Sequence, residues 1–392
     1  MKYLTFFIST LTLLLACVAL FNWFVDPYGM YWSPVVDGVN ARKTEAFERV
    51  HVSKPYRVSQ VRPQVLLVGN SRIEMGLKAE SSLFNGKRVF NLGMPGIGLE
   101  RQFGEALKQI EENTQLESII FSLDYLDFLY TREDFERPGQ EFIWQNLLQP
   151  RGMQQRARDV SSLLLSLDTL FSSIKTMAKQ HVTSSHISAY GSHYADSYIN
   201  IMQSEGIKPL FSQKLKQIAQ SLQSKRYVSH LGQVEKNPGL KMFATFLEKT
   251  RLADIEVTFF ISPYHYTYLH MLNKHNHWQS FLQWKMALVS TIEPYKDGHA
   301  SLWDFSGFSS YTMEPVDFTQ PRKLMKWYWE PAHYRSELGE VMLKALTKST
   351  SSSDFARKME QSTVRDIIIL DQKALLQSAA AWQAFSTQID GD

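Results

Sequence analysis

The feature that most constrains this chain is an uncharged run near its start, from Leu4 to Phe24 (LTFFISTLTLLLACVALFNWF). As a helix with a rise of 1.5 Å per residue, its 21 residues match a hydrocarbon core of about 30 Å. We therefore predict a bacterial-type membrane anchor in residues 1–26. Lys2 before the run and Asp26 after it favour a single-pass protein of the inner (cytoplasmic) membrane, with its domain on the periplasmic side.

Two other interpretations of this run stay open. A cleaved signal peptide has an apolar stretch of about 7–15 residues and a small-residue cleavage site, whereas this run is longer and has no clear site. The string Leu14-Leu15-Ala16-Cys17 resembles a bacterial lipobox, which would replace the span with a lipid anchor. Against it, the hydrophobic run continues through residues 18–24.

The composition excludes several classes of protein. The chain is 44% hydrophobic and 21% charged, which is typical of a globular protein. A net charge of +3 supplies no field for nucleic acid, so we expect no nucleic-acid partner. Cys17 is the only cysteine, so the folded part has no disulfide and no thiolate metal site. We also expect no cofactor.

Strand and helix patterns alternate along the chain and predict an α/β fold. Short apolar runs typical of buried strands occupy 65–68, 88–91, 118–121 and 255–261. Residues 99–112 have helical spacing. The alternation predicts a three-layer, doubly wound parallel sheet of SGNH/flavodoxin-like type, with chemistry at the strand ends, near 69–72, 91–98 and 122–127.

The same patterns divide the chain into segments. We expect a membrane-proximal stem over 27–62 and an α/β domain over 63–348. Within that domain, residues of about 131–241 have a helical pattern too long for a loop, which predicts an insertion over the strand ends. A helix is expected to start after His333 and to run through Leu346. The C-terminal segment 349–392 is expected to contain one helix over 364–385.

Two short motifs could carry chemistry. In Gly69-Asn70-Ser71-Arg72, a serine follows a buried strand and precedes a helix, where backbone N–H groups could stabilise an oxyanion. The alternative is an Asn-Ser turn that only caps the helix. In Glu330-Pro331-Ala332-His333, the carboxylate could orient the imidazole as a base for the serine.

These motifs resemble the SGNH (GDSL-like) hydrolase superfamily over about residues 63–348. Gly69-Asn70-Ser71 followed by Gly76 is similar to the first block, with Asn70 in place of Asp. Asn91-Leu-Gly-Met-Pro-Gly96 is similar to the second block, and Glu330-x-x-His333 to the last, with Glu for Asp. The resemblance implies that Ser71 is the nucleophile, His333 its base, Glu330 the orienting group and Gly96 an oxyanion donor.

The third block departs from the family, which has an asparagine donor where this chain has Asp124. An ionised carboxylate only accepts hydrogen bonds, so Asp124 cannot stabilise an oxyanion unless it is protonated. Arg72 could either pair with Asp124 or take over the anion-stabilising role. The departure puts full hydrolase activity in doubt and leaves acyl chemistry at the serine plausible.

Further candidate substrate contacts are Asn91, His265 and Trp329. Aromatic residues near the motifs could stack on sugar rings or pack in the core, and both interpretations stay open: Tyr264, Tyr266, Trp327, Tyr328 and Trp329. His265 and the cluster His270, His275 and His277 could suggest a metal. Their irregular spacing is more typical of a solvated helix face, so we expect no metal site.

An N-terminal anchor followed by an SGNH-like domain resembles proteins of exopolysaccharide acetylation and cell-envelope modification. The resemblance implies a serine esterase or O-acyl(acetyl)transferase that acts on an envelope or exported polysaccharide. Its partners would be the membrane, the polysaccharide or acyl-ester substrate, and a membrane-bound acyltransferase or export protein. The alternative is a catalytically inactive protein that binds polysaccharide or scaffolds an envelope assembly.

Overall fold

A six-stranded sheet lies at the centre of the computed structural model, which describes residues 1–130, 153–224, 237–296, 298–348 and 354–390. The strand order is β10-β7-β6-β3-β1-β2, and all neighbours are parallel except the antiparallel pair β10 and β7. The strands are β1 Val65–Val68, β2 Val89–Asn91, β3 Ser118–Leu123, β6 Glu256–Ile261, β7 Ala300–Asp304 and β10 Arg357–Lys358. The predicted α/β class with a mostly parallel sheet is confirmed.

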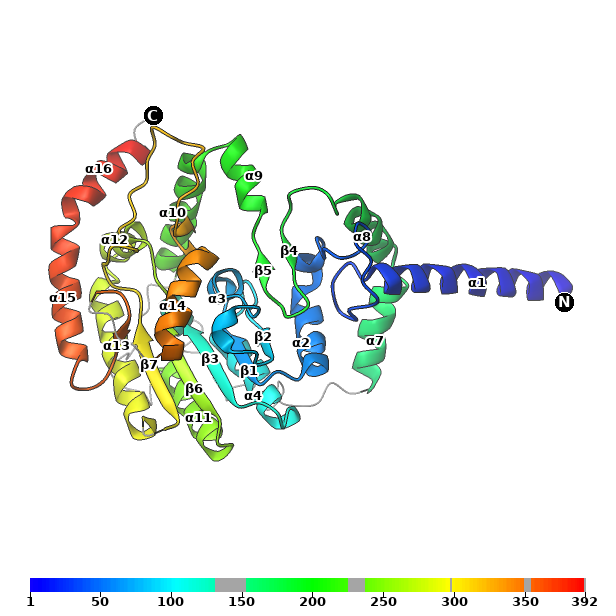
Figure 1. Ribbon diagram of the computed structural model, residues 1–392, viewed down its shortest axis with the longest axis horizontal. Helices are drawn as coiled ribbons and strands as arrows, with labels where there is room; N and C mark the ends of the chain where they lie inside the picture. Colours follow the sequence, from blue (N-terminus) through cyan, green and yellow to red (C-terminus); the bar gives the residue numbers. More distant parts are fainter. Residues whose placement is uncertain (131–152, 225–236, 297, 349–353, 391–392) are drawn as a thin grey trace.

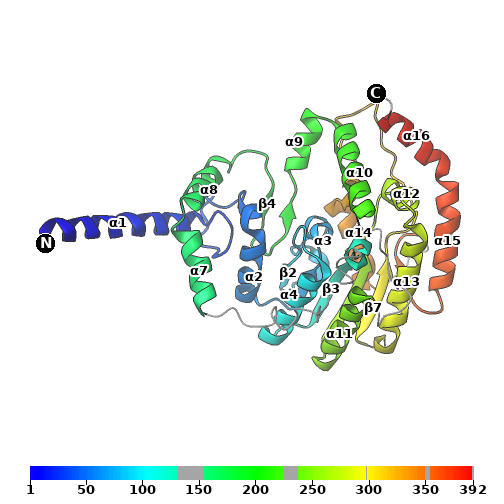
Figure 2. The same cartoon turned by 180° about the vertical axis from the view of Figure 1, so that it is seen from behind.

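Helices cover both faces of this sheet, so its central strands are almost continuously apolar. All four residues of β1 are buried, as are five of the six in β3. One face carries α3 Ser71–Gly76 and α14 Ser336–Lys348, and the other carries α4 Leu99–Glu112, α11 Pro238–Leu252 and α13 Trp278–Ile292 (Figures 1 and 2).

The N-terminal helix α1 (Lys2–Val25) projects from the body (Figure 1). Among the described residues, it alone is long and apolar enough to cross a membrane, a property that anchors and signal sequences share. The expected stem at 27–62 includes α2 Val50–Val61, and Val50 and Val58 belong to the hydrophobic core of the domain. This segment therefore packs as part of the body.

The described part of the expected insertion is largely helical. It contains α7 Met153–Leu164, α8 Leu167–Ala178, α9 Ser197–Ser204 and α10 Ile207–Ser224, with a small hairpin of β4 His186–Ile187 and β5 His193–Tyr194. The parts of this prediction at 131–152 and 225–236 lie outside the described residues.

The C-terminal part differs from the expectation of one helix over 364–385. Two helices, α15 Val364–Gln377 and α16 Ala379–Asp390, meet at Ser378. The Ser378 hydroxyl bonds the Leu375 carbonyl at 3.0 Å and lies 2.9 Å from His270 Nε2 of α12 (Tyr266–Lys274). This tertiary contact accounts for the break.

Candidate active site

The turn that presents Ser71 follows directly from the local sequence. Strand β1 ends at Val68, and Gly69 has φ of +151°, which suits glycine; a side chain there would also meet Ser122. Asn70 caps α3, with its Oδ1 accepting the Arg72 N–H at 3.0 Å. Ser71 is thus the first residue of α3, half-buried at the carboxyl end of the sheet.

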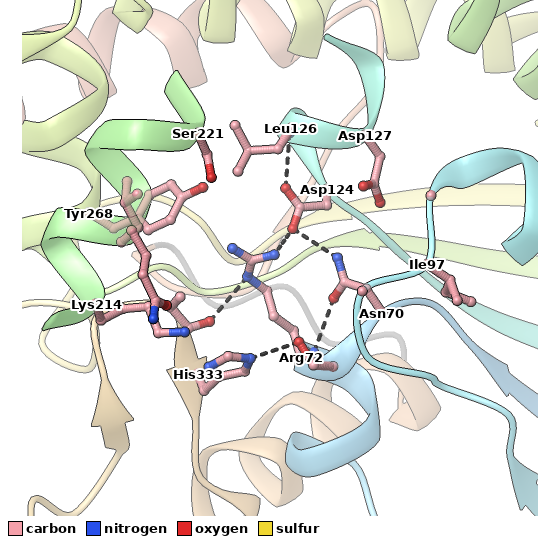
Figure 3. A pocket seen from close by; sticks show the side chains of 16 residues that line it. Asn70, Arg72, Ile97, Asp124, Leu126, Asp127, Lys214, Ser221, Tyr268 and His333 are labelled. Carbon is pink, nitrogen blue, oxygen red and sulfur yellow. Dashed lines mark hydrogen bonds and ion pairs between the residues drawn. The ribbon is translucent and has the colours of Figure 1, made fainter. Parts of the chain in front are cut away.

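A distant hairpin brings the base to this serine. His333 begins β9 (His333–Tyr334), which pairs with β8 (Tyr328–Glu330). His333 Nε2 lies 2.7 Å from Ser71 Oγ, although the residues are 262 positions apart (Figure 3). The other ring nitrogen contacts Glu330 Oε1, and Glu330 Oε2 accepts the Ala332 N–H at 2.8 Å. Ser71, His333 and Glu330 therefore form a continuous hydrogen-bonded chain.

Two glycines allow α3 to pack closely against this hairpin and against α14. A Cβ on Gly76 would overlap the ring of Tyr334, the residue after the base. A Cβ on Gly339 of α14 would overlap the Gly76 carbonyl oxygen. Gly76 therefore lets the helix with Ser71 pack directly against the strand with His333, and Gly339 lets α14 pack directly against the end of α3.

The charges of the pair suit a general base. Burial would raise the pKa of Glu330, but His333, Lys214 and the Ala332 N–H together outweigh burial. The net pKa is lowered, so the carboxylate is ionised. Burial, with the nearby positive charges of Lys214 and Arg72, lowers the pKa of His333 by more than Glu330 raises it. The imidazole is therefore neutral near pH 7, with its Nδ1–H donated to Glu330 and its Nε2 lone pair facing the serine hydroxyl.

Asp124 holds the turn in place. It follows β3 and is 2% exposed. Its carboxylate accepts the Asn70 side-chain amide at 2.9 Å and the Leu126 N–H at 3.0 Å, and it forms an ion pair with Arg72 (Figure 3). Of the two roles expected for Arg72, pairing with Asp124 is the one the structure shows.

Arg72 also joins the serine turn to the histidine hairpin. Its Nε–H donates to the Ala332 carbonyl at 3.1 Å, one residue before His333. Its guanidinium lies over the rings of Tyr264 and Tyr268, 5.0 and 5.5 Å from their centres. Arg72 and Asp124 therefore position the two halves of the site.

Gly96 borders the same pocket as Ser71. It is exposed, has φ of +67°, and a Cβ there would meet no atom within 4 Å. It lies in the loop that leads to α4, whose N-cap is Gly98. The site thus has the Ser71 and Gly96 backbone N–H groups as candidate oxyanion donors, while the Asn70 amide is directed to Asp124.

Asn91, which was expected to contact substrate, is buried and does not line the pocket. Its amide donates to the Ile73 and Leu77 carbonyls at 2.9 and 2.8 Å, and its oxygen accepts the Gly93 N–H at 2.9 Å. Asn91 is fully buried, so it ties α3 to the loop that carries Gly96.

His265 and Trp329 also lie in the interior, away from the pocket. His265 Nδ1 and Nε2 are each 2.8 Å from their partners, Thr267 Oγ1 and the Glu314 carbonyl oxygen. Burial lowers the pKa of His265 to about 4. Trp329 packs against Tyr198 and beneath the Arg335 guanidinium.

The interpretation of the histidine cluster as a solvated face is wrong for His270 and His277, whereas His275 is half-buried. His270 is 4% and His277 is 3% exposed, and they lie close to the Ser378 hydroxyl and the Tyr125 hydroxyl, respectively.

Among the residues that the structure describes, the five aromatic rings considered for sugar stacking do not line the pocket. Four of them are buried and Trp327 is half-buried; the buried ones are Tyr264, Tyr266, Tyr328 and Trp329.

The pocket in front of Ser71 has a volume of about 390 Å³. One of its walls consists of residues that lie outside the sequence motifs. Helix α10 contributes Lys214, Gln217, Ile218 and Ser221 (Figure 3). Lys214 Nζ lies 3.7 Å from Glu330 Oε1 and adds positive charge beside the triad. An insertion over the strand ends was expected, but its helical pattern does not reveal which side faces the site.

Within the described ranges, no three His, Cys, Asp or Glu side chains gather in a way that could hold a metal ion. Ser71, His333 and Glu330 lie in order along one hydrogen-bonded chain that opens into the pocket. No protein-family model and no curated protein matches this chain.

Proposed function

We propose that this chain is a serine-dependent acyl-ester hydrolase or O-acyltransferase of SGNH-like type. The observation that carries the proposal is the 2.7 Å approach of His333 Nε2 to Ser71 Oγ, with Glu330 on the opposite ring nitrogen. A neutral imidazole bonded to a hydroxyl can accept its proton as the oxygen attacks a carbonyl. The strand order, with the serine after β1, is consistent with a doubly wound sheet of this type.

The reaction follows from these positions. Ser71 Oγ attacks the ester carbonyl and its proton passes to His333, giving a tetrahedral intermediate whose oxyanion meets the Ser71 and Gly96 N–H groups. Collapse breaks the ester bond, and the departing alcohol takes the proton from His333. Water or an acceptor hydroxyl then attacks acyl-Ser71 and gives its proton to His333. Collapse of this second intermediate breaks the bond from the acyl carbon to Ser71 Oγ, which takes the proton back from His333.

The absence of a third donor on Asp124 limits the rate. One missing oxyanion donor costs about 3 kcal/mol, or roughly a hundredfold in rate, and leaves the remaining catalysis in place. We therefore expect a slow enzyme both in hydrolysis and in transfer to an acceptor hydroxyl, because the two reactions pass through the same oxyanion.

The pocket lining supports a hydroxyl-rich acceptor such as a sugar. Lys214, Gln217 and Ser221 give α10 a row of hydrogen-bonding groups beside the triad. Together with the resemblance to envelope-modifying proteins, this lining leads us to propose a cell-envelope or exported polysaccharide as the substrate.

We also propose that α1 remains attached as a single-pass anchor, with the domain outside the cytoplasm. Asn22, near the end of the apolar run, is buried against the domain. Its amide donates to the Leu164 carbonyl at 2.9 Å, and its oxygen accepts the Ser173 hydroxyl at 2.9 Å. These bonds support an anchor, because a cleaved signal peptide has no need to fit the mature domain.

The test is turnover of a small acyl ester by the full chain. We expect Ser71→Ala and His333→Ala each to lower kcat by about 10⁵-fold or more, and the double variant to be no worse, because the two act as one unit. Ser204→Ala and His181→Ala, at exposed positions outside the pocket, serve as matched controls. Equal rates for wild type and Ser71→Ala would overturn the proposal and favour a polysaccharide-binding protein.

A further inference from the structure

Helix α8 exposes its large apolar residues and buries its polar ones. Its outward side carries large apolar residues: Leu167, Phe171 and Ile174 are 67%, 61% and 52% exposed. Spacings of four and three residues place them on one face. Its inward side is polar, and the buried residues are Thr169, Ser172, Ser173 and Thr176. A helix on a soluble domain has the reverse arrangement, with its apolar face toward the core.

This helix lies beside the end of α1. Ser173 of α8 donates to Asn22 of α1, and the Leu164 carbonyl at the end of α7 accepts from the same asparagine. Figures 1 and 2 show α7 and α8 at the end of the body from which α1 projects. The polar side of α8 is therefore used for contact with α1 and the domain, which leaves the apolar side outward.

The length of α1 sets the level of α8 relative to a bilayer. A hydrocarbon core of about 30 Å takes about 20 helical residues, so a span that begins at Leu4 ends near Trp23. Trp23 is 41% exposed, as expected of an aromatic residue at a membrane boundary. Asn22, which holds α8, lies at that same level.

A second apolar patch lies next to the same end of α1. Val35 and Val36 are 49% and 42% exposed. Asn40 holds their loop in place, since its amide donates to the Phe24 carbonyl at 2.7 Å and its oxygen accepts the Val36 N–H at 2.7 Å. The apolar surface thus continues from α1 onto two separate segments of the domain.

We propose that the outward face of α8, with Val35 and Val36, is seated in the outer interfacial layer of the lipid bilayer. This inference rests on the proposed anchoring by α1. A bilayer is the occupant because the apolar surface is continuous with the span and lies at its boundary. Exposed Lys175 borders the α8 face, where its ammonium group can meet phospholipid phosphates. The contact gives the domain a fixed orientation on the membrane.

The experiment uses the full chain with Cys17→Ser, which removes the only cysteine. A polarity-sensitive NBD dye is attached through Phe171→Cys or Ile174→Cys, in vesicles of phosphatidylethanolamine and phosphatidylglycerol with and without doxyl-labelled lipid. Leu13→Cys, on exposed α1, reports the span, and Leu252→Cys, an exposed apolar site on α11, reports water.

We expect the dyes at 171 and 174 to emit at shorter wavelength and to lose most of their emission to doxyl groups placed near the headgroup. The dye at 13 should be quenched by deep doxyl groups, and the dye at 252 by neither. Quenching at 13 with water-like emission at 171 and 174 would overturn the inference and keep the anchor. Short-wavelength emission without lipid quenching would indicate a protein contact and also overturn it. An unquenched dye at 13 would refute the anchor itself.

Discussion

Glu330→Gln tests how the triad is oriented, because both carboxylate oxygens are used. Oε1 contacts the Nδ1 side of His333, and Oε2 accepts the Ala332 N–H at 2.8 Å. A carboxylate can accept from two donors at once, whereas an amide of the same shape has one oxygen and one NH₂ group. In the variant, either the His333 Nδ1–H or the Ala332 N–H must therefore face the NH₂ group, which is itself a donor.

Either arrangement of the amide damages the site. If the NH₂ group faces His333, the ring must move its proton to Nε2, where it can no longer accept from Ser71. If the NH₂ group faces Ala332, the buried N–H loses its partner at a cost of about 1–3 kcal/mol. The imidazolium also loses its counter-charge. A wrong tautomer in a serine triad costs about 10⁴-fold in kcat, so we expect a loss of about 10²- to 10⁴-fold, milder than Ser71→Ala.

The assay is the pH profile of kcat/KM for a small acyl ester. Activity needs the neutral imidazole, so it falls as pH drops through the pKa of His333. The Glu330 charge raises that pKa against the effect of burial. Its removal should move the acidic limb to lower pH while the plateau falls. Glu337→Gln, in an exposed ion pair with Arg335, is the control and should change neither. An unchanged plateau and limb for Glu330→Gln would refute the reasoning.

Two further predictions concern stability. Asp124→Asn leaves Arg72 buried without its counter-ion, so we expect a loss of about 3 kcal/mol in urea unfolding; full stability with raised esterase activity would instead mean that position 124 faces the oxyanion. Arg357→Met breaks its ion pairs with Asp304 and Asp371 and should cost about 3 kcal/mol. Burial would raise the pKa of Asp304, but Arg357 and Lys285 lower it overall, so this stabilisation is present above about pH 4 and is lost as pH falls through the lower folded value. Acid unfolding of the variant should therefore begin at higher pH; an unchanged midpoint would contradict this.

The parts of the site set by local sequence could be predicted. A buried apolar strand followed by Gly69 and Asn70 leaves little choice but a turn into a helix, which puts Ser71 at the sheet edge. His333 lies in the separate β8-β9 hairpin and not at the end of a strand of this sheet, so the family resemblance, more than the parallel topology, predicted its place near Ser71.

The parts set by tertiary contact could not be predicted. Sequence shows Asp124 and Arg72 as possible partners, but only the packed structure fixes their pairing. The histidines on and next to α12 have the spacing of a solvated face, yet helices and loops from elsewhere in the chain cover most of them. Likewise, the pattern of α10 shows a helix and says nothing about which turns line the pocket.

The same limit explains the strands that sequence patterns missed. Strand β10 has two residues, and its Arg357 is held by buried carboxylates of β7 and α15. Strand β7, at Ala300–Asp304, ends in one of those carboxylates and so lacks a purely apolar run.

Covalent capture of the nucleophile tests the account most directly. A fluorophosphonate reacts only with a serine whose hydroxyl is activated: Oγ bonds to phosphorus, fluoride leaves, and the proton goes to the base. Mass spectrometry of the labelled full chain should find the adduct on Ser71. The adduct should be absent in Ser71→Ala, strongly reduced in His333→Ala, and unchanged in Ser204→Ala. A folded wild-type protein that takes up no label at Ser71 would contradict the catalytic triad.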